Sequence, residues 1–324
     1  MTKARENSDY TGLAADITAG DTAARAGRKN FILNGGFDVW QRGTSLTAAS
    51  SYLADRWSNG TSEAQSRQAF TVGQTEVDGN PTYYHRGGGG GSAYYGLDHK
   101  IENVGTLSGK EVTLSYWMKG SSAFTNAPYR GQNFGSGGSS GVEAALSTSS
   151  ITTSWVRYTH TFTFPSISGK TVGASSFSQL NVFRANIANI VVDIANVQLE
   201  LGSVATDFEH RSYGEELRLC QRYFYRYKGA TQERIYNENA GATAKWWFLT
   251  FPEMRTTPTA TFSPAWTGGS IVVIGGTINS MTVGGGSSTA MSFRVTNSGS
   301  GGTVKALYHT DSFSQDYCYL SAEL

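Results

Sequence analysis

Residues 31–45 read FILNGGFDVWQRGTS, and the interpretation of the first half of the chain begins with them. Phe31, Leu33 and Phe37 can enter a hydrophobic core, while the Asn-Gly-Gly between them supplies a bend. We expect this stretch to open a β-rich domain that closes near residues 191–208.

The composition favours an all-β protein with little net charge. The 324 residues are enough for two globular domains, and 26 basic side chains nearly cancel 25 acidic ones. This balance gives no reason to expect nucleic acid or an anionic membrane as a partner. The 39 glycines against 6 prolines, with 12% aromatic residues, indicate strands joined by glycine turns.

The cysteines and the N-terminus restrict the chemistry and the location further. Cys220 and Cys318 lack metal-ligand spacing and are too few for a disulfide framework, so we expect buried, reduced thiols. No apolar run approaches the ~18 residues that span a bilayer, so we expect no membrane insertion. The first residues lack the apolar region of a signal peptide, which predicts assembly in a cytoplasm.

Alternation with a period of two predicts strands in two segments. Within residues 111–119, one face would carry Val112, Leu114, Tyr116 and Met118. Residues 155–164 repeat the pattern, with His160 on the apolar face. The apolar phase then slips by one residue near Ala195-Asn196, which predicts a β-bulge. These strands indicate a two-sheet antiparallel sandwich.

Weaker signals complete this first domain. Residues 69–77 are a weak strand candidate, and residues 94–104 are a stronger one. Residues 87–91 are all glycine and residues 131–141 are nearly all Gly and Ser, so both are expected to be exposed loops.

A helix signal marks the joint between two domains. Ser212 to Glu215 have the form of a capping box, and a short helix would follow before residues 222–227 alternate as a strand. Residues 245–251 read as a strand buried on both faces, within a second β-rich region. The expected organisation is an N-terminal extended arm (1–29), a jelly-roll-like sandwich (30–211), a helix–strand joint (212–228) and a second, jelly-roll-like C-terminal β-sandwich (229–324).

The arm itself has two interpretations. Residues 1–30 contain few large apolar side chains and cannot bury enough surface to offset their ordering entropy alone. They are either a disordered leader or an attachment arm that orders against a partner.

The sequence contains no convincing set of catalytic or cofactor-binding residues. The five histidines lack zinc-site spacing, and His160 is expected to be a core imidazole. Residues 137–141 match a nucleophile-elbow pattern but lie in a Gly/Ser loop, and residues 169–171 lack the first glycine of a phosphate-binding loop. A glycosidase needs two facing carboxylates, which the sequence does not pair. We therefore expect no enzyme activity and no cofactor.

Sugar binding has more support, because flat aromatic rings stack on the C–H faces of pyranoses. Neighbours in a strand point to opposite faces, so one member of each adjacent aromatic pair would point outward. The predicted sugar-binding pairs are Tyr83 with Tyr84, Tyr94 with Tyr95, and Trp246 with Trp247. The same pairs could instead fill subunit interfaces.

Residues 34–38 and the closing stretch 194–200 resemble the first and last strands of the cellulose- and xylan-binding jelly-roll modules of bacterial glycoside hydrolases. Some of those modules hold a structural calcium with an acid after the first-strand Phe and an Asp pair in the last strand. Asp38 matches the first position, whereas Ala195-Asn196 stands where the acidic pair would be. The resemblance therefore implies Asp38 only as a weakened calcium candidate.

A longer ordered set of segments resembles phage tail fibre and receptor-binding proteins. These segments are residues 34–43, 54–57, 101–102, 107–110, 197–202 and 215–223. The resemblance implies a homotrimer on the phage tail that contacts a host surface glycan or protein and joins other tail or virion proteins through residues 1–30. Three alternatives stay open: a head decoration or baseplate part that never touches host sugar, a carbohydrate-binding module of a cellular protein, and a virion enzyme that degrades polysaccharide.

Overall fold

The computed structural model divides the chain into two compact units. Unit 1 comprises residues 1–216 with Leu324, and unit 2 comprises residues 217–323. The structure describes residues 29–47, 52–60, 63–89, 95–185, 187, 189–228, 244–262, 271–273, 278–297, 307–309 and 317–324. The expected N-terminal arm, except for its last residue, lies outside the described residues.

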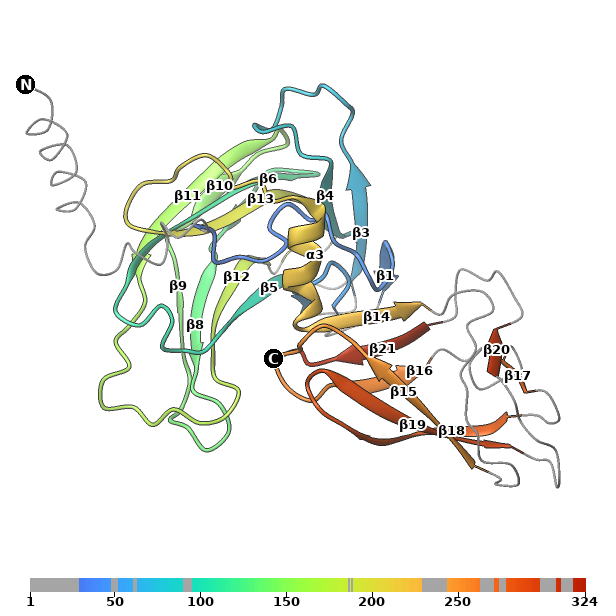
Figure 1. Cartoon of the computed structure of the whole chain (residues 1–324). Helices are drawn as coiled ribbons and strands as arrows, with labels where there is room; N and C mark the ends of the chain where they lie inside the picture. Colours follow the sequence, from blue (N-terminus) through green and yellow to red (C-terminus); the bar gives the residue numbers. More distant parts are fainter. Residues whose placement is uncertain are drawn as a thin grey trace, which may run out of the picture. The chain divides into compact units, whose positions relative to one another are not determined.

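Unit 1 is built from two large antiparallel sheets (Figure 1). The six-stranded sheet has the order β1 (Ser45–Thr47), β3 (Ala64–Ala69), β4 (Tyr83–Gly88), β13 (Val191–Leu201), β6 (Glu111–Gly120), β11 (Val156–Thr163). The five-stranded sheet has the order β2 (Trp57–Asn59), β5 (Tyr95–Glu102), β12 (Phe177–Ala185), β8 (Tyr129–Asn133), β9 (Val142–Ala145). A small ribbon pairs β7 (Phe124–Asn126) with β10 (Ser149–Ile151).

The chain crosses repeatedly from one large sheet to the other. The strands β4, β6, β11 and β13 lie in the six-stranded sheet, and β5, β8 and β12, which come between them in sequence, lie in the five-stranded sheet. This alternation is the jelly-roll pattern. The prediction of an all-β protein with antiparallel sandwiches and a short helix is confirmed.

The core of unit 1 lies between the two sheets. Val112, Leu114, Tyr116 and Met118 are all fully buried, as their alternation along β6 predicts. From the opposite sheet, Leu97 and Leu180 join the same hydrophobic cluster. His160 is buried as expected, and its Nε2 lies 3.1 Å from the Tyr116 hydroxyl. Burial lowers the pKa of His160, so it is a neutral core imidazole.

The predicted bulge in β13 is confirmed. The pairing of β13 with β6 shifts register between Ala195 and Gln198, and Asn196 has a left-handed backbone with φ of 46°. The extra residue returns Val197 and Leu199 to the core side, where both are fully buried. Within β13, the alternation of core-facing and outward-facing side chains therefore changes phase at the bulge.

The opening stretch lies against this bulge, but it forms turns where a first strand was expected. Asn34 and Phe37 both have φ of 56°, which interrupts an extended backbone. The Phe31 amide donates to the Leu199 carbonyl at 2.9 Å, and the Val197 amide donates to the Gly35 carbonyl at 2.9 Å. A Cβ on Gly35 would lie 2.1 Å from the Val197 oxygen, so only glycine fits there.

Unit 2 consists of smaller antiparallel sheets and part of the helix. Helix α3 runs from Tyr213 to Gln221, and the boundary between the units falls within it. The strands are β14 (Phe224–Lys228), β15 (Ala244–Thr250), β16 (Thr259–Phe262), β17 (Ile271–Val273), β18 (Ile278–Gly286), β19 (Ala290–Asn297), β20 (Leu307–His309) and β21 (Tyr317–Ser321). Their sheets have the orders β14-β21-β16, β15-β19-β18 and β17-β20.

A second core joins two of these sheets. Leu249 of β15, Met291 of β19 and Leu320 of β21 belong to one buried cluster. Cys318 lies in the same cluster as a free thiol, and burial raises its pKa to about 12. Within the described parts of the chain, no helix is long and apolar enough to cross a membrane.

Some strand predictions are wrong. Residues 70–82 form a loop after β3, and Val72 is fully exposed, because Phe70 packs on Tyr84 instead of continuing the strand. Gly131, expected in a loop, is buried within β8. Strand β12 was not expected at all.

Candidate functional site

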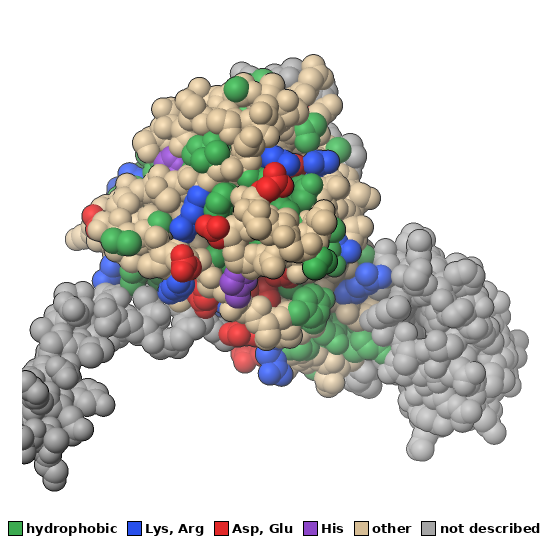
Figure 2. Space-filling view, turned by 90° about the horizontal axis from the view of Figure 1, so that it is seen from above, with side chains coloured by type: hydrophobic (Ala, Val, Ile, Leu, Met, Phe, Trp, Pro, Cys, Tyr) green, Lys and Arg blue, Asp and Glu red, His purple; other side chains and the backbone are tan. Residues whose placement is uncertain are grey.

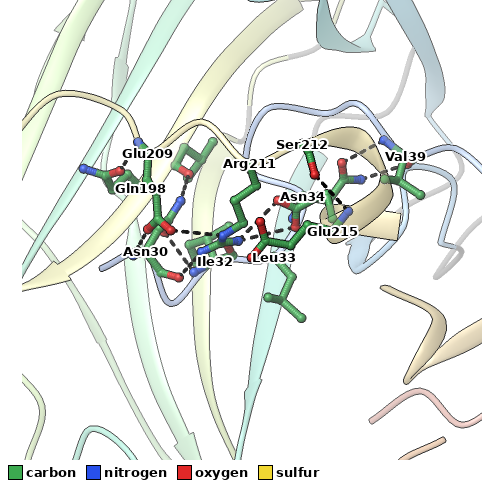
Figure 3. A network of polar contacts seen from close by, with 12 residues as sticks. Asn30, Ile32, Leu33, Asn34, Val39, Gln198, Glu209, Arg211, Ser212 and Glu215 are labelled. Atoms are coloured by element: carbon green, nitrogen blue, oxygen red, sulfur yellow. Dashed lines mark hydrogen bonds and ion pairs between the residues drawn. The ribbon is translucent and has the colours of Figure 1, made fainter. Parts of the chain in front are cut away.

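A polar network holds the opening stretch of unit 1 in place (Figure 3). Arg211 is its centre: its Nη2 donates to the Asn30 carbonyl at 2.6 Å and its Nη1 to the Ile32 carbonyl at 3.2 Å. The same guanidinium forms ion pairs with Glu209 and Glu216, both at 3.3 Å. Because the Arg211 side chain is only 4% exposed, these contacts replace the water that it loses.

Asn34 completes this network. Its Nδ2 donates to the carbonyls of Val39 (2.8 Å) and Asp55 (3.0 Å), and its Oδ1 accepts the Val39 amide (2.9 Å). Glu216 Oε1 accepts the Asn34 amide at 2.6 Å. The Ser212 hydroxyl accepts the Glu215 amide at 3.3 Å, as the predicted N-cap requires. Asn34 and Glu216, which come from two of the segments that carry the resemblance, are therefore part of the framework.

The predicted aromatic pairs have different surroundings. Tyr84 is half-buried and packs on Phe70 and Trp155, with ring centroids at 4.7 and 5.3 Å. Tyr83 lies under the Arg67 guanidinium, 4.3 Å from the ring centroid. Tyr94 lies outside the described residues, and so do the side chains of Tyr95, Trp246 and Trp247, whose backbones lie in β5 and β15. Sugar binding by these six residues stays a prediction.

Asp38 lies in a pocket beside Trp40 and Arg67. Burial, with a smaller contribution from the Glu216 carboxylate, raises the pKa of Asp38 to about 6. In the described parts of the chain, no group of three or more His, Cys, Asp or Glu side chains could hold a metal ion. Asp38 belongs to no such group, and the calcium site that the resemblance implied stays a prediction.

A polar row crosses the outer face of the five-stranded sheet. Asp98 of β5 lies opposite Asn181 of β12, and Asn181 lies opposite Tyr129 of β8. Because the neighbouring Leu180 is fully buried in the core, Asn181 points away from it. The next row pairs Gln179 with Gly131, where a Cβ would lie 3.4 Å from Glu143 Cγ and 3.7 Å from Gln179 Cβ.

These residues line a pocket of about 120 Å³, which we call the sheet-face site. Its lining residues are Asp98, Tyr129, Arg130, Gly131, Glu143, Gln179, Asn181 and Arg184. The Arg184 guanidinium lies 4.4 Å from the centre of the Tyr129 ring and forms an ion pair with Glu143 at 3.7 Å. Tyr129 is thus held in place as a half-buried ring at the wall of this pocket.

The sheet-face site contains a buried acceptor without a donor. Asn181 is 6% exposed, and its Oδ1 has no hydrogen-bond partner. Gln179 Nε2 donates to Asp98 Oδ1 at 3.0 Å. Burial raises the pKa of Asp98, although hydrogen bonds from Gln179 and Asn181 partly oppose this. An unpaired buried oxygen costs free energy unless a ligand or water supplies a hydrogen.

Sequence reasoning proposed none of these residues for sugar binding. They are divided among four strands, with three on β8 and three on β12, and no two are adjacent aromatics. Asp98, Tyr129 and Asn181 come together only through the register of β5, β12 and β8. Alternation of polar residues with Leu180 and Val182 was the one available signal, and it is weak.

Charge does not point to a polyanionic partner. Figure 2 shows a face of unit 1 on which basic and acidic side chains are interspersed and hydrophobic side chains are scattered. Such a surface has no strong field of one sign.

The sequence matches no protein-family model and no curated protein. Among solved structures, the chain is similar to the CBM22-2 xylan-binding domain of Paenibacillus barcinonensis Xyn10C, with 12% identity, a TM-score of 0.34, and coverage of 45% of this chain and 92% of that one. A Clostridium thermocellum xylanase fragment, the CBM22-1 and GH10 modules of Xyn10B, is 13% identical with a TM-score of 0.37, over 55% of this chain and 30% of that one.

The enzymatically active domain of tailspike protein 4 from bacteriophage CBA120 is 12% identical with a TM-score of 0.32, over 54% of this chain and 22% of that one. The chain thus spans less than a third of the xylanase and tailspike structures. Because the identities and TM-scores are this low, these similarities assign no function to the chain.

Proposed function

We propose that this chain is a carbohydrate-binding protein without enzyme activity, and that it serves as a trimeric phage tail fibre that recognises a host surface glycan. One observation carries the glycan-binding part: the sheet-face site places the unpartnered Asn181 Oδ1 beside the Tyr129 ring on an otherwise polar sheet surface. A sugar offers hydroxyl donors and an apolar C–H face in the same geometry.

The remaining groups of the site fit the same ligand class. Asp98 accepts hydrogen bonds and Arg184 donates them, so hydroxyls on both sides of a sugar ring find partners. Glu143 is paired with Arg184 and Asp98 accepts a hydrogen bond from Gln179, which supports a role for both carboxylates in binding.

The virion role is supported by the ordered sequence resemblance across residues 30–225. Each site is small and would bind one sugar unit weakly, and three linked copies would raise the avidity without new contacts. The sheet-face site would serve a carbohydrate-binding module of a cellular protein equally well, so this second function is tested alongside the first.

Binding of host polysaccharide to the purified full-length chain tests the glycan-binding part. Tyr129→Ala should weaken binding at least tenfold, because ring stacking and the position of Arg184 are lost together. Tyr158→Ala on β11 of the other sheet is the matched control and should bind like the parent. Equal binding by both variants would contradict the proposal, and release of reducing ends would contradict the absence of enzyme activity.

Two further measurements test the virion part. Light scattering should report three protomers, and labelled protein should stain host cells and not unrelated cells. A monomer that binds polysaccharide would support the cellular carbohydrate-binding module instead.

A further inference from the structure

A larger pocket lies where the bulge of β13 meets the opening stretch of unit 1. We call it the bulge pocket; its volume is about 520 Å³. Its lining includes Asp38, Trp40, Arg67, Tyr83, Asn196 and Phe208. A second compartment of about 400 Å³, beside Trp117 and Arg157, shares Asn196, Phe208 and His210 with it. The bulge pocket has no residue in common with the sheet-face site.

The bulge places an unpaired acceptor between the two compartments. Asn196 is 3% exposed and has the left-handed backbone that turns its side chain out of the normal alternation. Its Nδ2 donates to the Asp78 carbonyl at 3.0 Å, which fixes the amide. Its Oδ1 has no hydrogen-bond partner. The fold therefore holds a buried carbonyl oxygen at the pocket wall.

The Asp38 carboxylate and the Arg67 guanidinium also line this pocket, and neither forms an ion pair with a described residue. Among the described residues, no donor is bonded to the Asp38 carboxylate, and no carboxylate pairs with Arg67. The Arg67 guanidinium is held over the Tyr83 ring at 4.3 Å. By contrast Arg211, which also lines the pocket, is paired with two carboxylates, those of Glu209 and Glu216.

The charges and shape indicate a neutral, hydroxyl-rich ligand. The charges of the Asp38 carboxylate and the Arg67 guanidinium are opposite, so together these two groups favour neither an anion nor a cation. Asp38 and Asn196 accept hydrogen bonds while Arg67 donates them, which suits adjacent hydroxyls. Trp40, Tyr83 and Phe208 supply apolar walls of the kind that C–H faces contact.

We propose that the bulge pocket is a second carbohydrate site, which takes a neutral sugar unit and acts independently of the sheet-face site. Each protomer would then hold two sugar-binding positions built on different sheets. This inference stands on its own residues and does not require the sheet-face site to bind.

Sugar binding in the bulge pocket is tested by titrating the full-length chain with neutral monosaccharides: glucose, galactose, mannose and xylose. Calorimetry and the NMR resonance of the Trp40 indole follow the titration. At least one sugar should bind and shift that resonance. Arg67→Met and Asp38→Asn should each weaken this binding at least tenfold. Asn196→Gly, which keeps the left-handed backbone but removes the amide, should do the same. Tyr129→Ala should leave it unchanged.

The outcomes separate the two sites. Loss of binding in Tyr129→Ala, with parental binding in all three pocket variants, would overturn the inference and leave the proposed function intact. Loss in the pocket variants alone would support the inference even if the sheet-face site fails. Failure of all four sugars to shift the Trp40 resonance would also overturn it. Circular dichroism melts show whether each variant is folded, and the three independent pocket substitutions keep the test decisive if one is not.

Discussion

Two pairs of buried asparagines in unit 1 have opposite surroundings. Asn30 and Asn34, in the opening stretch, use both the oxygen and the nitrogen of their side-chain amides. Asn181 and Asn196, on β12 and β13, are nearly as buried, but each has an oxygen with no partner. The same side chain thus stabilises the framework in one region and leaves an open bonding position in the other.

This difference separates what folds the protein from what it binds. A satisfied buried amide contributes to stability, whereas an unsatisfied one costs free energy and persists where a ligand completes it. The following predictions test that separation, from the largest expected change in the free energy of unfolding to the smallest.

Asn34→Ala should lower the free energy of unfolding by about 3–4 kcal/mol. It leaves the Val39 amide and two carbonyls without partners in a fully buried site, at a φ of 56°. Urea denaturation followed by circular dichroism measures this. Asn103→Ala, which has a φ of 67° in an exposed turn, is the matched control and should cost about 1 kcal/mol. If both substitutions lowered the free energy of unfolding equally, the buried hydrogen bonds of Asn34 would not explain its effect.

Arg211→Met should lower the free energy of unfolding by about 2–3 kcal/mol, because Glu209 and Glu216 lose their partner while partly buried. Arg218→Met, at an exposed position of α3, should change it by less than about 0.5 kcal/mol. A cost for Arg211→Met as small as that of the control would show that the network does not hold the opening stretch.

Asp38→Asn should stabilise the protein by about 1 kcal/mol at pH 8. Its pKa is raised to about 6 when folded, chiefly by burial and also by Glu216, so its contribution to stability is full below pH 4 and lost as the pH rises through about 6. Arg67, Arg211 and His210 also line its pocket. The gain should vanish at pH 4, and urea denaturation at the two pH values measures it.

Asn181→Ala should cost only about 1 kcal/mol, because its oxygen makes no hydrogen bond in the free protein and only the hydrogen bond from its amide nitrogen to Asp98 is lost. Asn126→Ala is the buried counterpart: its amide bonds Tyr116 and the Val182 carbonyl, and its loss should cost about 2–3 kcal/mol. If Asn181→Ala were the more costly, Asn181 would belong to the framework and not to a binding site.

Much of the fold could be predicted because it depends on local alternation. The strands at 111–120 and 156–163 and the slip at Ala195-Asn196 are visible in the sequence, since each apolar side chain enters one core. β12 was missed because its outer face is polar, with Ser178 and the short apolar run at 182–183 disguising the period. Residues 69–77 were misread because Phe70 anchors a loop.

The sheet-face site could not be predicted, because its residues are brought together by strand register and not by their spacing in the sequence, whereas Tyr83 of the bulge pocket was among the predicted sugar-binding residues. Adjacent aromatics such as Tyr83 and Tyr84 attracted attention, yet Asp98, Asn181 and Tyr129 are separated by tens of residues along the chain and become neighbours only across three strands. An unpaired oxygen such as that of Asn196 has no sequence signature, because the tertiary structure decides whether a donor lies within hydrogen-bond distance of it.

The bulge in β13 has a consequence for how this protein can change. Ala195 and Val197 are fully buried on either side of it, whereas position 196 faces the pocket and contributes little to the core. Mutations at 196 that tolerate a left-handed backbone can therefore alter ligand preference while the scaffold is inherited intact. The single extra residue of the bulge thus gives β13 one position that can be substituted without changing the core.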